Sequence, residues 1–231
     1  MIHAYLSRPG TDHIHLGRAN EDRVRVLSRD GLTTAAICDG AGSFGAGAEA
    51  AELVSDALTA LLHRQFDILF SQPADQTRAA LVRAVEDVLH AHSRRRGIRE
   101  QELACTILAA AIHEDGRCLC VHLGDGIILQ QNKDDTSPSV VSCPMTGLAP
   151  YSTYLTMNCD LGHYLRLYRW EAADLSQLLL LSDGAAEHLV RLRGGAGWVY
   201  TAGKPDIQAI RTRLHTANPR DDHSALLISR L

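Results

Sequence analysis

Four short acidic elements, each at the edge of an apolar run, are spread over almost the whole chain. A strand that ends in an aspartate brings its carboxylate to the rim of a sheet, so a fold that collects such strand ends also collects carboxylates. Gathered carboxylates repel one another unless cations hold them, and oxygen ligands suit hard divalent ions. The sequence therefore predicts a fold built around a metal site. The elements are Asn20-Glu21-Asp22, Cys38-Asp39-Gly40, Leu181-Ser182-Asp183-Gly184 and Asp221-Asp222-His223-Ser224.

The length and organisation of the chain favour one domain over residues 1–231. With 231 residues, of which 45% are hydrophobic, the chain is long enough to bury a substantial core. No proline-rich, serine-rich or highly charged linker separates the acidic elements. A domain boundary would therefore divide the candidate site.

Charge and cysteine usage indicate a soluble, cytoplasmic protein. The net charge of -4 provides no global field that would attract nucleic acid or anionic lipid. The six cysteines include no CxxC pair, no secretory leader precedes them, and no apolar segment is long enough to span a bilayer. The basic run at residues 94–96 is interpreted as a solvated helix end. We therefore expect no nucleic-acid partner and no membrane partner.

Apolar periodicity predicts a strand hairpin and two helices in the first half of the chain. Residues 22–28 and 33–38 have strand character, and a turn at residues 29–31 lies between them. After Gly47, apolar residues recur at the i, i+3, i+4 and i+7 spacing of an amphipathic helix. A second helix is expected around residues 81–89.

The second half consists mainly of predicted strands, interrupted by two further helices. The run at residues 177–181 is apolar on both faces and is expected to form a central strand. Helices are expected from Ala185 to about Leu192 and from Pro205. Three consecutive antiparallel strands with reversals at Asp115-Gly116 and Asp125-Gly126, and four shorter or later ones, complete the pattern: 105–112, 117–123, 127–130, 140–141, 154–156, 164–170 and 224–228.

This order of elements favours an α+β fold. Strand runs interrupted by paired helices, without steady βαβ alternation, are typical of layered architectures. We expect a four-layer α-β-β-α sandwich, in which two antiparallel sheets pack face to face and helices cover their outer surfaces.

The acidic elements belong to six longer stretches that occur in this order: NEDRVRV, AICDGAGSFGAGAEAAELV, ACTILAAAI, VHLGDGIIL, LLLLSDGAAEHL and DDHSALLI. Together they resemble the metal-dependent serine/threonine protein phosphatases of type 2C, particularly the compact bacterial branch with an Asp-Gly-Ala-Gly-Ser element. The likeness runs from about Gly10 to Leu231. It implies hydrolysis of phosphoserine and phosphothreonine in a phosphorylated protein substrate, in opposition to a cognate Ser/Thr kinase.

The resemblance also implies a binuclear centre of Mn2+ or Mg2+ ions. Asp39 would bridge the two ions, and the carbonyl of Gly40 would help to hold one of them. Asp183 and Asp221 would complete the shell of the other ion. Two such ions lower the pKa of a shared water, which can then attack phosphorus without a protein nucleophile.

Further residues of the resemblance lie around these ligands. Asp22, or Glu21, would act through bound water, and Asp125 would hold a weaker third ion. In the C-terminal element Asp221 is preferred to Asp222 as the ligand, because Ser224 fixes the register. We therefore expect Asp222→Asn to have a mild effect on turnover.

The chain departs from the family pattern at two positions that bear on phosphate. Gly17 stands where members often carry a phosphate-binding arginine, so Arg18, one residue later, is only a hypothesis for that role. Ala41 stands where some members carry a histidine that acts as general acid. His13 or metal-bound water must then protonate the leaving oxygen if protonation is needed.

Three other interpretations compete with this one. Residues 40–45 fit GxGxxG, but no second strand ending in an acid follows, which disfavours a dinucleotide-binding oxidoreductase. His13 and His15 would share a face of a strand, but no second Cys/His cluster at ligand spacing supports a transition-metal site. A phosphatase-like scaffold that only binds a phosphoprotein would normally lose metal aspartates, whereas this chain keeps them.

Overall fold

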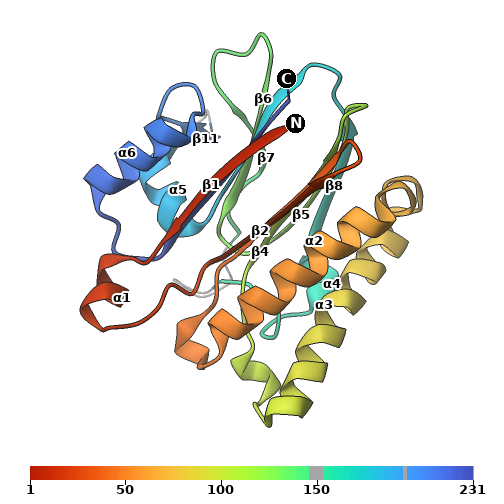
Figure 1. The fold of residues 1–231 in the computed structure, drawn as a ribbon, viewed down its shortest axis with the longest axis vertical. Helices are drawn as coiled ribbons and strands as arrows, with labels where there is room; N and C mark the ends of the chain where they lie inside the picture. The colour runs from red at the N-terminus through yellow and green to blue at the C-terminus, as the bar shows by residue number, and fades with distance from the viewer. Residues whose placement is uncertain (146–152, 195–196, 231) are drawn as a thin grey trace.

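Two five-stranded antiparallel sheets pack face to face in the computed structural model, which describes residues 1–145, 153–194 and 197–230 (Figure 1). The first sheet has the spatial order β2-β3-β4-β5-β8, and the second has the order β1-β12-β9-β6-β7. Helices cover the outer face of each sheet, which confirms the predicted α+β fold with α-β-β-α layers.

The elements of the two sheets come from both ends and the middle of the chain. The first sheet contains β2 (Arg23–Arg29), β3 (Leu32–Cys38), β4 (Ile107–His113), β5 (Arg117–Leu123) and β8 (Arg166–Glu171). The second contains β1 (Ile2–Arg8), β12 (His223–Ser229), β9 (Leu175–Leu181), β6 (Ile127–Asn132) and β7 (Ser139–Ser142). The helices are α1 (Thr11–His15), α2 (Gly47–Ser71), α3 (Ala74–Arg96), α4 (Leu161–Tyr164), α5 (Asp183–Leu189) and α6 (Ile207–Ala217).

The predicted hairpin of β2 and β3 is confirmed, and its turn explains the register. Arg29 pairs with Leu32, so only Asp30 and Gly31 lie in the loop. Both have positive φ, 52° and 76°, which suits the two-residue turn that matches strand twist. This register places Arg23 opposite Cys38 and so brings the residues on either side of that pair together.

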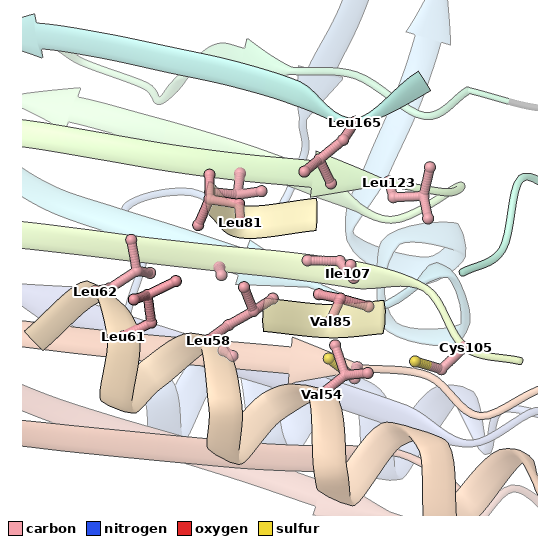
Figure 2. Close-up of a cluster of buried hydrophobic side chains, with 14 of the residues drawn as sticks. Val54, Leu58, Leu61, Leu62, Leu81, Val85, Cys105, Ile107, Leu123 and Leu165 are labelled. Atoms are coloured by element: carbon pink, nitrogen blue, oxygen red, sulfur yellow. The ribbon is translucent and has the colours of Figure 1, made fainter. Parts of the chain in front are cut away.

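The long helices α2 and α3 pack on the first sheet through leucine and valine side chains at helical spacing (Figure 2). Leu58 and Leu62 of α2, and Leu81 and Val85 of α3, have no exposed surface. Each pair is four residues apart and therefore lies on one face of its helix. Burial of each such side chain contributes about 1.5–3 kcal/mol relative to exposure. The periodicity that predicted both helices thus also identifies their packing face.

Alternating residues of the central strands fill the layers on either side of each sheet. In β9, Leu178 and Leu180 lie in the core between the sheets, whereas Leu179 and Leu181 pack toward α5 and α6. This confirms the prediction that residues 177–181 form a strand buried on both faces.

The third strand of the predicted consecutive series, β6, lies in the other sheet, so that part of the prediction is wrong. β4 and β5 pair with each other, but β6 pairs with β9 and β7. Gly124 has φ of 107°, and a Cβ on Gly126 would lie 2.7 Å from the Leu108 side chain. The Gly124-Asp125-Gly126 segment is therefore a crossing between sheets rather than a hairpin turn, and it leaves Asp125 where the sheets meet.

Other local predictions also differ from the structure. The strand expected at 154–156 is absent in the described residues, and Thr156 instead contacts Cys105. The helix expected to reach Leu192 ends at Leu189, where the chain continues as β10 (Val190–Arg193) paired with β11 (Gly197–Tyr200). β1 was not predicted, because only one of its side chains is buried and the apolar signal is weak.

Two sequence-based expectations concern features outside the sheets. Residues 12–15 lie in the helix α1 and not in a strand, so His13 and His15 do not share the strand face required for the transition-metal interpretation. The basic run at 94–96 forms the last turn of α3 and is exposed, as expected. In the described ranges, no helix combines the length and apolar character needed to cross a lipid bilayer.

Candidate active site

The strand register brings the acidic elements to one edge of the two sheets. Asp39 directly follows β3, and Asp22 directly precedes β2, its pairing partner. On the other sheet Leu181 pairs with Ala225, and the N–H of Ser182 donates to the carbonyl of Ser224 over 3.0 Å. The sequence places aspartates next to both of these strand ends.

Asp22 is deeply buried, with 2% of its surface exposed. Its Oδ2 accepts a hydrogen bond from Ser182 Oγ at 3.0 Å, across the interface between the sheets. Its Oδ1 is buried and has no hydrogen-bond partner among the described residues. Because a buried carboxylate oxygen without a partner is costly, this atom is suited to a cation or an ordered water.

The carboxylates lie close enough to shift the pKa values of one another. Burial raises the pKa of Asp22 to about 7 and that of Asp183 to about 8, and neighbouring carboxylates add to both effects. Burial raises the pKa of Asp39 well above its usual range, and the charges of Asp22, Asp183, Asp221 and Asp125 raise it further. A divalent cation would offset this mutual repulsion.

Two cavities meet at Asp39. The larger, of 330 Å³, is also lined by Asp125 and Asp183, and the smaller, of 200 Å³, is also lined by Asp221 and Arg18. The Asp39 side chain therefore borders both a space with two further aspartates and a space with an arginine. A carboxylate in this position can contribute its oxygens to a ligand in either cavity.

The glycines after Asp39 allow the chain to approach the site closely. A Cβ on Gly40 would collide with the backbone of Gly47, and a Cβ on Gly42 would overlap the carboxylate of Glu21. Gly40 also pairs with Cys105 in an isolated bridge. The Asp-Gly-Ala-Gly-Ser element is thus held against both β4 and the segment that carries Glu21.

The chemistry of the donor set fits Mg2+ or Mn2+, although the side chains do not converge on one point. Among the described residues, no three His, Cys, Asp or Glu side chains are arranged as a ready metal-binding group. The pKa shifts nevertheless show that Asp22, Asp39, Asp125 and Asp183 share one electrostatic environment. An oxygen-only set with a buried unpartnered atom is what a hard divalent ion requires.

Two threonines that the sequence motifs did not indicate hold the aspartates in place. The N–H of Asp39 donates to Thr106 Oγ1 at 3.0 Å, and the N–H of Thr106 donates to the Asp39 carbonyl at 2.9 Å. Thr153 Oγ1 donates a short hydrogen bond to Asp125 Oδ2. Thr153 lies outside the six stretches that carry the family resemblance, so those motifs did not indicate its role.

Serine residues of two acidic elements join neighbouring strands of the second sheet beneath the site, and Ser182 also connects this sheet to Asp22. Ser182 Oγ accepts from the N–H of Ser224 at 2.9 Å while donating to Asp22. Ser224 Oγ contacts Ser7 Oγ at 2.8 Å. The repeated serine beside an aspartate in LSDG and DDHS was visible in the sequence, and the structure gives it a positioning role.

Asp222 lines the smaller cavity and also joins distant segments of the chain. It is 2% exposed, and its carboxylate accepts hydrogen bonds from the N–H of Gly10 at 2.8 Å and of Glu21 at 2.5 Å. His13 Nδ1 lies 3.0 Å from the same carboxylate. Asp221 lines the same cavity but is exposed.

We expect Asp222→Asn to lower the free energy of unfolding by about 3 kcal/mol, because an amide N–H₂ would face a backbone donor in a buried position. Thermal unfolding should therefore show a melting temperature roughly 6–12 °C below that of the wild type. Asp221→Asn, as the matched variant of an exposed neighbour, should change the melting temperature of the metal-free protein by less than about 2 °C. Equal losses in the two variants would contradict this division of roles.

Arg18 and His13 both line the smaller cavity. Arg18 lies close enough to Glu21 to counteract the rise in the pKa of Glu21 that burial causes. The displaced arginine is therefore near the carboxylates and exposed to an incoming anion, and His13 is held in its position by Asp222.

Comparison with known proteins identifies similar sequences and folds. The sequence pattern of the family described as Protein phosphatase 2C matches residues 9–217. No curated protein sequence matches the chain.

Similar solved structures cover almost the whole chain. The serine/threonine phosphatase Stp1 from Staphylococcus aureus is 16% identical with a TM-score of 0.66, over 99% of this chain and 94% of Stp1. A bacterial serine phosphatase is 15% identical with a TM-score of 0.66, over 99% and 97%. RsbX, crystallised in complex with magnesium, is 14% identical with a TM-score of 0.58, over 97% and 92%. At these identities the likeness establishes the fold.

Proposed function

Because the chain belongs to the protein phosphatase 2C family, we propose that it hydrolyses phosphoserine and phosphothreonine in proteins, as one catalytic domain in the cytosol that opposes a Ser/Thr kinase. The observation that carries the proposal is the placement of Asp39 at the meeting point of two cavities, within the electrostatic reach of four other aspartates. Similar structures of a bacterial serine phosphatase and of RsbX with magnesium support the same assignment.

Among the proposed ligands, Asp39 lines both cavities, Asp183 lines the larger and Asp221 lines the smaller. Asp39 would bridge two ions, Asp183 and Asp221 would complete one shell, and the Gly40 carbonyl with Asp22 or Glu21, through water, would serve the other. When bound, Mn2+ or Mg2+ would lower the pKa of water and offset charge on the phosphoryl oxygens. The residues that line the two cavities would then orient the phosphate group of the substrate and keep other groups away from it.

Arg18 and His13 are the chain's own candidates for contact with the phosphoryl group. Both line the cavity that Asp39 and Asp221 border. Arg18 would pair with phosphoryl oxygens, since a guanidinium can donate two parallel hydrogen bonds. His13, fixed through Nδ1 to Asp222, would donate a proton to the leaving seryl or threonyl oxygen.

The proposal is tested by release of phosphate from a phosphothreonine peptide. We expect turnover with Mn2+ or Mg2+ and none with EDTA, and a phosphotyrosine peptide of the same sequence serves as the specificity control. Calorimetric titration with Mn2+ is done in parallel. Tight metal binding without turnover of any peptide would favour a phosphatase-like scaffold instead.

Asp125 has a distinct expected role as ligand of a weaker third ion. Of the two cavities it borders the larger only, and it is tied to Thr153. Asp125→Ala should lower kcat about tenfold or more, because activity needs the third ion, while both tight Mn2+ sites persist. Calorimetry that shows loss of both tight sites would contradict this assignment.

A further inference from the structure

A separate cavity of 480 Å³ lies beside the catalytic cavities and shares no residue with them. It is bordered by the end of β1, by α1, by α6 and by residues 218–223, and we call it the α1–α6 groove. Leu6, Ile14, Leu214 and Pro219 give it apolar walls. Its volume is within the range of ligand-binding sites, and nothing in the proposed mechanism uses it.

Two arginines give the groove a cationic rim. Arg8 and Arg211 line it, and both are exposed. Neither forms an ion pair with a carboxylate in the part of the chain that the structure describes, where Arg211 makes one side-chain hydrogen bond, to Gln208 Oε1 at 3.3 Å. The nearby Asp12 is paired with Arg220 instead. Since the chain as a whole carries a net charge of -4, this rim is a local feature that favours an anionic partner.

The groove and the candidate phosphate site lie at two ends of one short segment. Ile14 lines the groove, and Arg18 lines the smaller catalytic cavity. Three residues lie between them, so their Cα atoms are at most about 14 Å apart. Ile14 is 59% exposed and Leu16 is 67% exposed, so apolar surface continues from the groove toward the site. About five residues of extended polypeptide would span that distance.

We propose that the α1–α6 groove docks an acidic and apolar segment of the phosphoprotein substrate. An apolar side chain would lie against Leu6, Ile14 and Leu214, and a carboxylate of the same segment would pair with Arg8 and Arg211. The proposal rests on the proposed phosphatase function. It gives the enzyme a means of selecting substrates by residues outside the phosphorylated one, without any contribution to the chemical step.

The test compares synthetic phosphothreonine peptides that differ only in charge at the docking segment. In the first pair, one peptide carries Leu-Glu-Leu-Glu and the other Leu-Lys-Leu-Lys about six residues before the phosphothreonine. In the second pair, the same two segments lie about six residues after it. In one of the two placements we expect KM to be about fivefold lower for the glutamate peptide, as two exposed ion pairs allow. This difference should disappear in the Arg8→Glu/Arg211→Glu double variant.

Two controls separate docking from general effects. The Arg64→Glu/Arg94→Glu double variant has the same charge change at exposed positions on α2 and α3, and it should keep the preference for the glutamate peptide. For p-nitrophenyl phosphate, which cannot reach the groove, kcat/KM should be unchanged within about twofold in both variants. Equal KM values for the glutamate and lysine peptides in wild type, or a preference that survives Arg8→Glu/Arg211→Glu, would overturn the proposal.

A binding measurement distinguishes this inference from the phosphatase function itself. Fluorescence anisotropy with the labelled, unphosphorylated Leu-Glu-Leu-Glu peptide needs no turnover, and the double variant should bind it about fivefold more weakly. If the double variant loses binding of this peptide while the wild-type protein turns over no phosphopeptide, the result would support docking in the groove and contradict the proposed catalytic function. Sedimentation that shows a wild-type dimer, dissociated by Arg8→Glu/Arg211→Glu, would assign the groove to a second copy of the chain and overturn the substrate proposal.

Discussion

Asp39→Asn is expected to lower kcat/KM for a phosphothreonine peptide about a thousandfold or more and to weaken Mn2+ binding. Asp39 borders both cavities and its pKa is raised by four neighbouring aspartates, so it is the residue that both ions would share. Asparagine keeps the shape of the side chain but removes the charge on which bridging depends.

The same substitution should have the opposite effect on the metal-free protein. Ionised Asp39 is repelled by its neighbours, and asparagine mimics its neutral form. At pH 8 with EDTA, the melting temperature of Asp39→Asn should therefore exceed that of the wild type by a few degrees. Asp134→Asn, at an exposed position, is the matched control and should change neither kcat/KM nor the melting temperature. An active Asp39→Asn protein with intact Mn2+ binding would show that the centre lies elsewhere.

The metal-free protein should lose stability as pH rises from about 6.5 to 8. The raised pKa values mean that folded Asp22, Asp39 and Asp183 retain protons which the unfolded chain has already released. The folded state binds more protons, so the free energy of unfolding falls with rising pH. We expect a loss of about 2 kcal/mol or more, or roughly 5 °C in melting temperature.

Histidines set the lower limit of that pH window. Burial lowers the pKa of His122 and of His223, so both contribute a rise in stability with pH that levels off above about pH 7. At higher pH the aspartates determine how the free energy of unfolding changes with pH. Mn2+ competes with protons for the carboxylates, so the melting-temperature increase it causes should be larger at pH 8 than at pH 6.5. If the metal-free protein instead became more stable between about pH 6.5 and 8, the inferred repulsion among these buried carboxylates would be wrong.

Local sequence patterns predicted most elements of the fold, because each has its own periodicity. The hairpin turn at Asp30-Gly31 and the leucine spacing of α2 are determined within a few residues. The sheet to which β6 belongs is not determined in this way. A short apolar run predicts a strand, but its partners depend on the crossing at Gly124-Asp125-Gly126, where close packing against Leu108 decides the path.

The candidate site was predicted as far as its residues lie at strand ends. The motifs placed Asp39 and Asp183 there, and the structure brings their carboxylates into one field. The supporting contacts could not be predicted, because they join residues far apart in the chain. Asp222 and Gly10 are 212 positions apart, and Thr153 and Asp125 are 28 positions apart.

The pairing of β1 with β12 has a consequence for how the protein is made. β12 lies between β1 and β9, and Asp222, just before it, is bonded to Gly10 and Glu21. A nascent chain on the ribosome can form the helical layer and the first sheet, but a central position of the second sheet stays vacant until residues 221–229 emerge. The proposed catalytic activity should therefore arise late and all at once, when this last strand is in place.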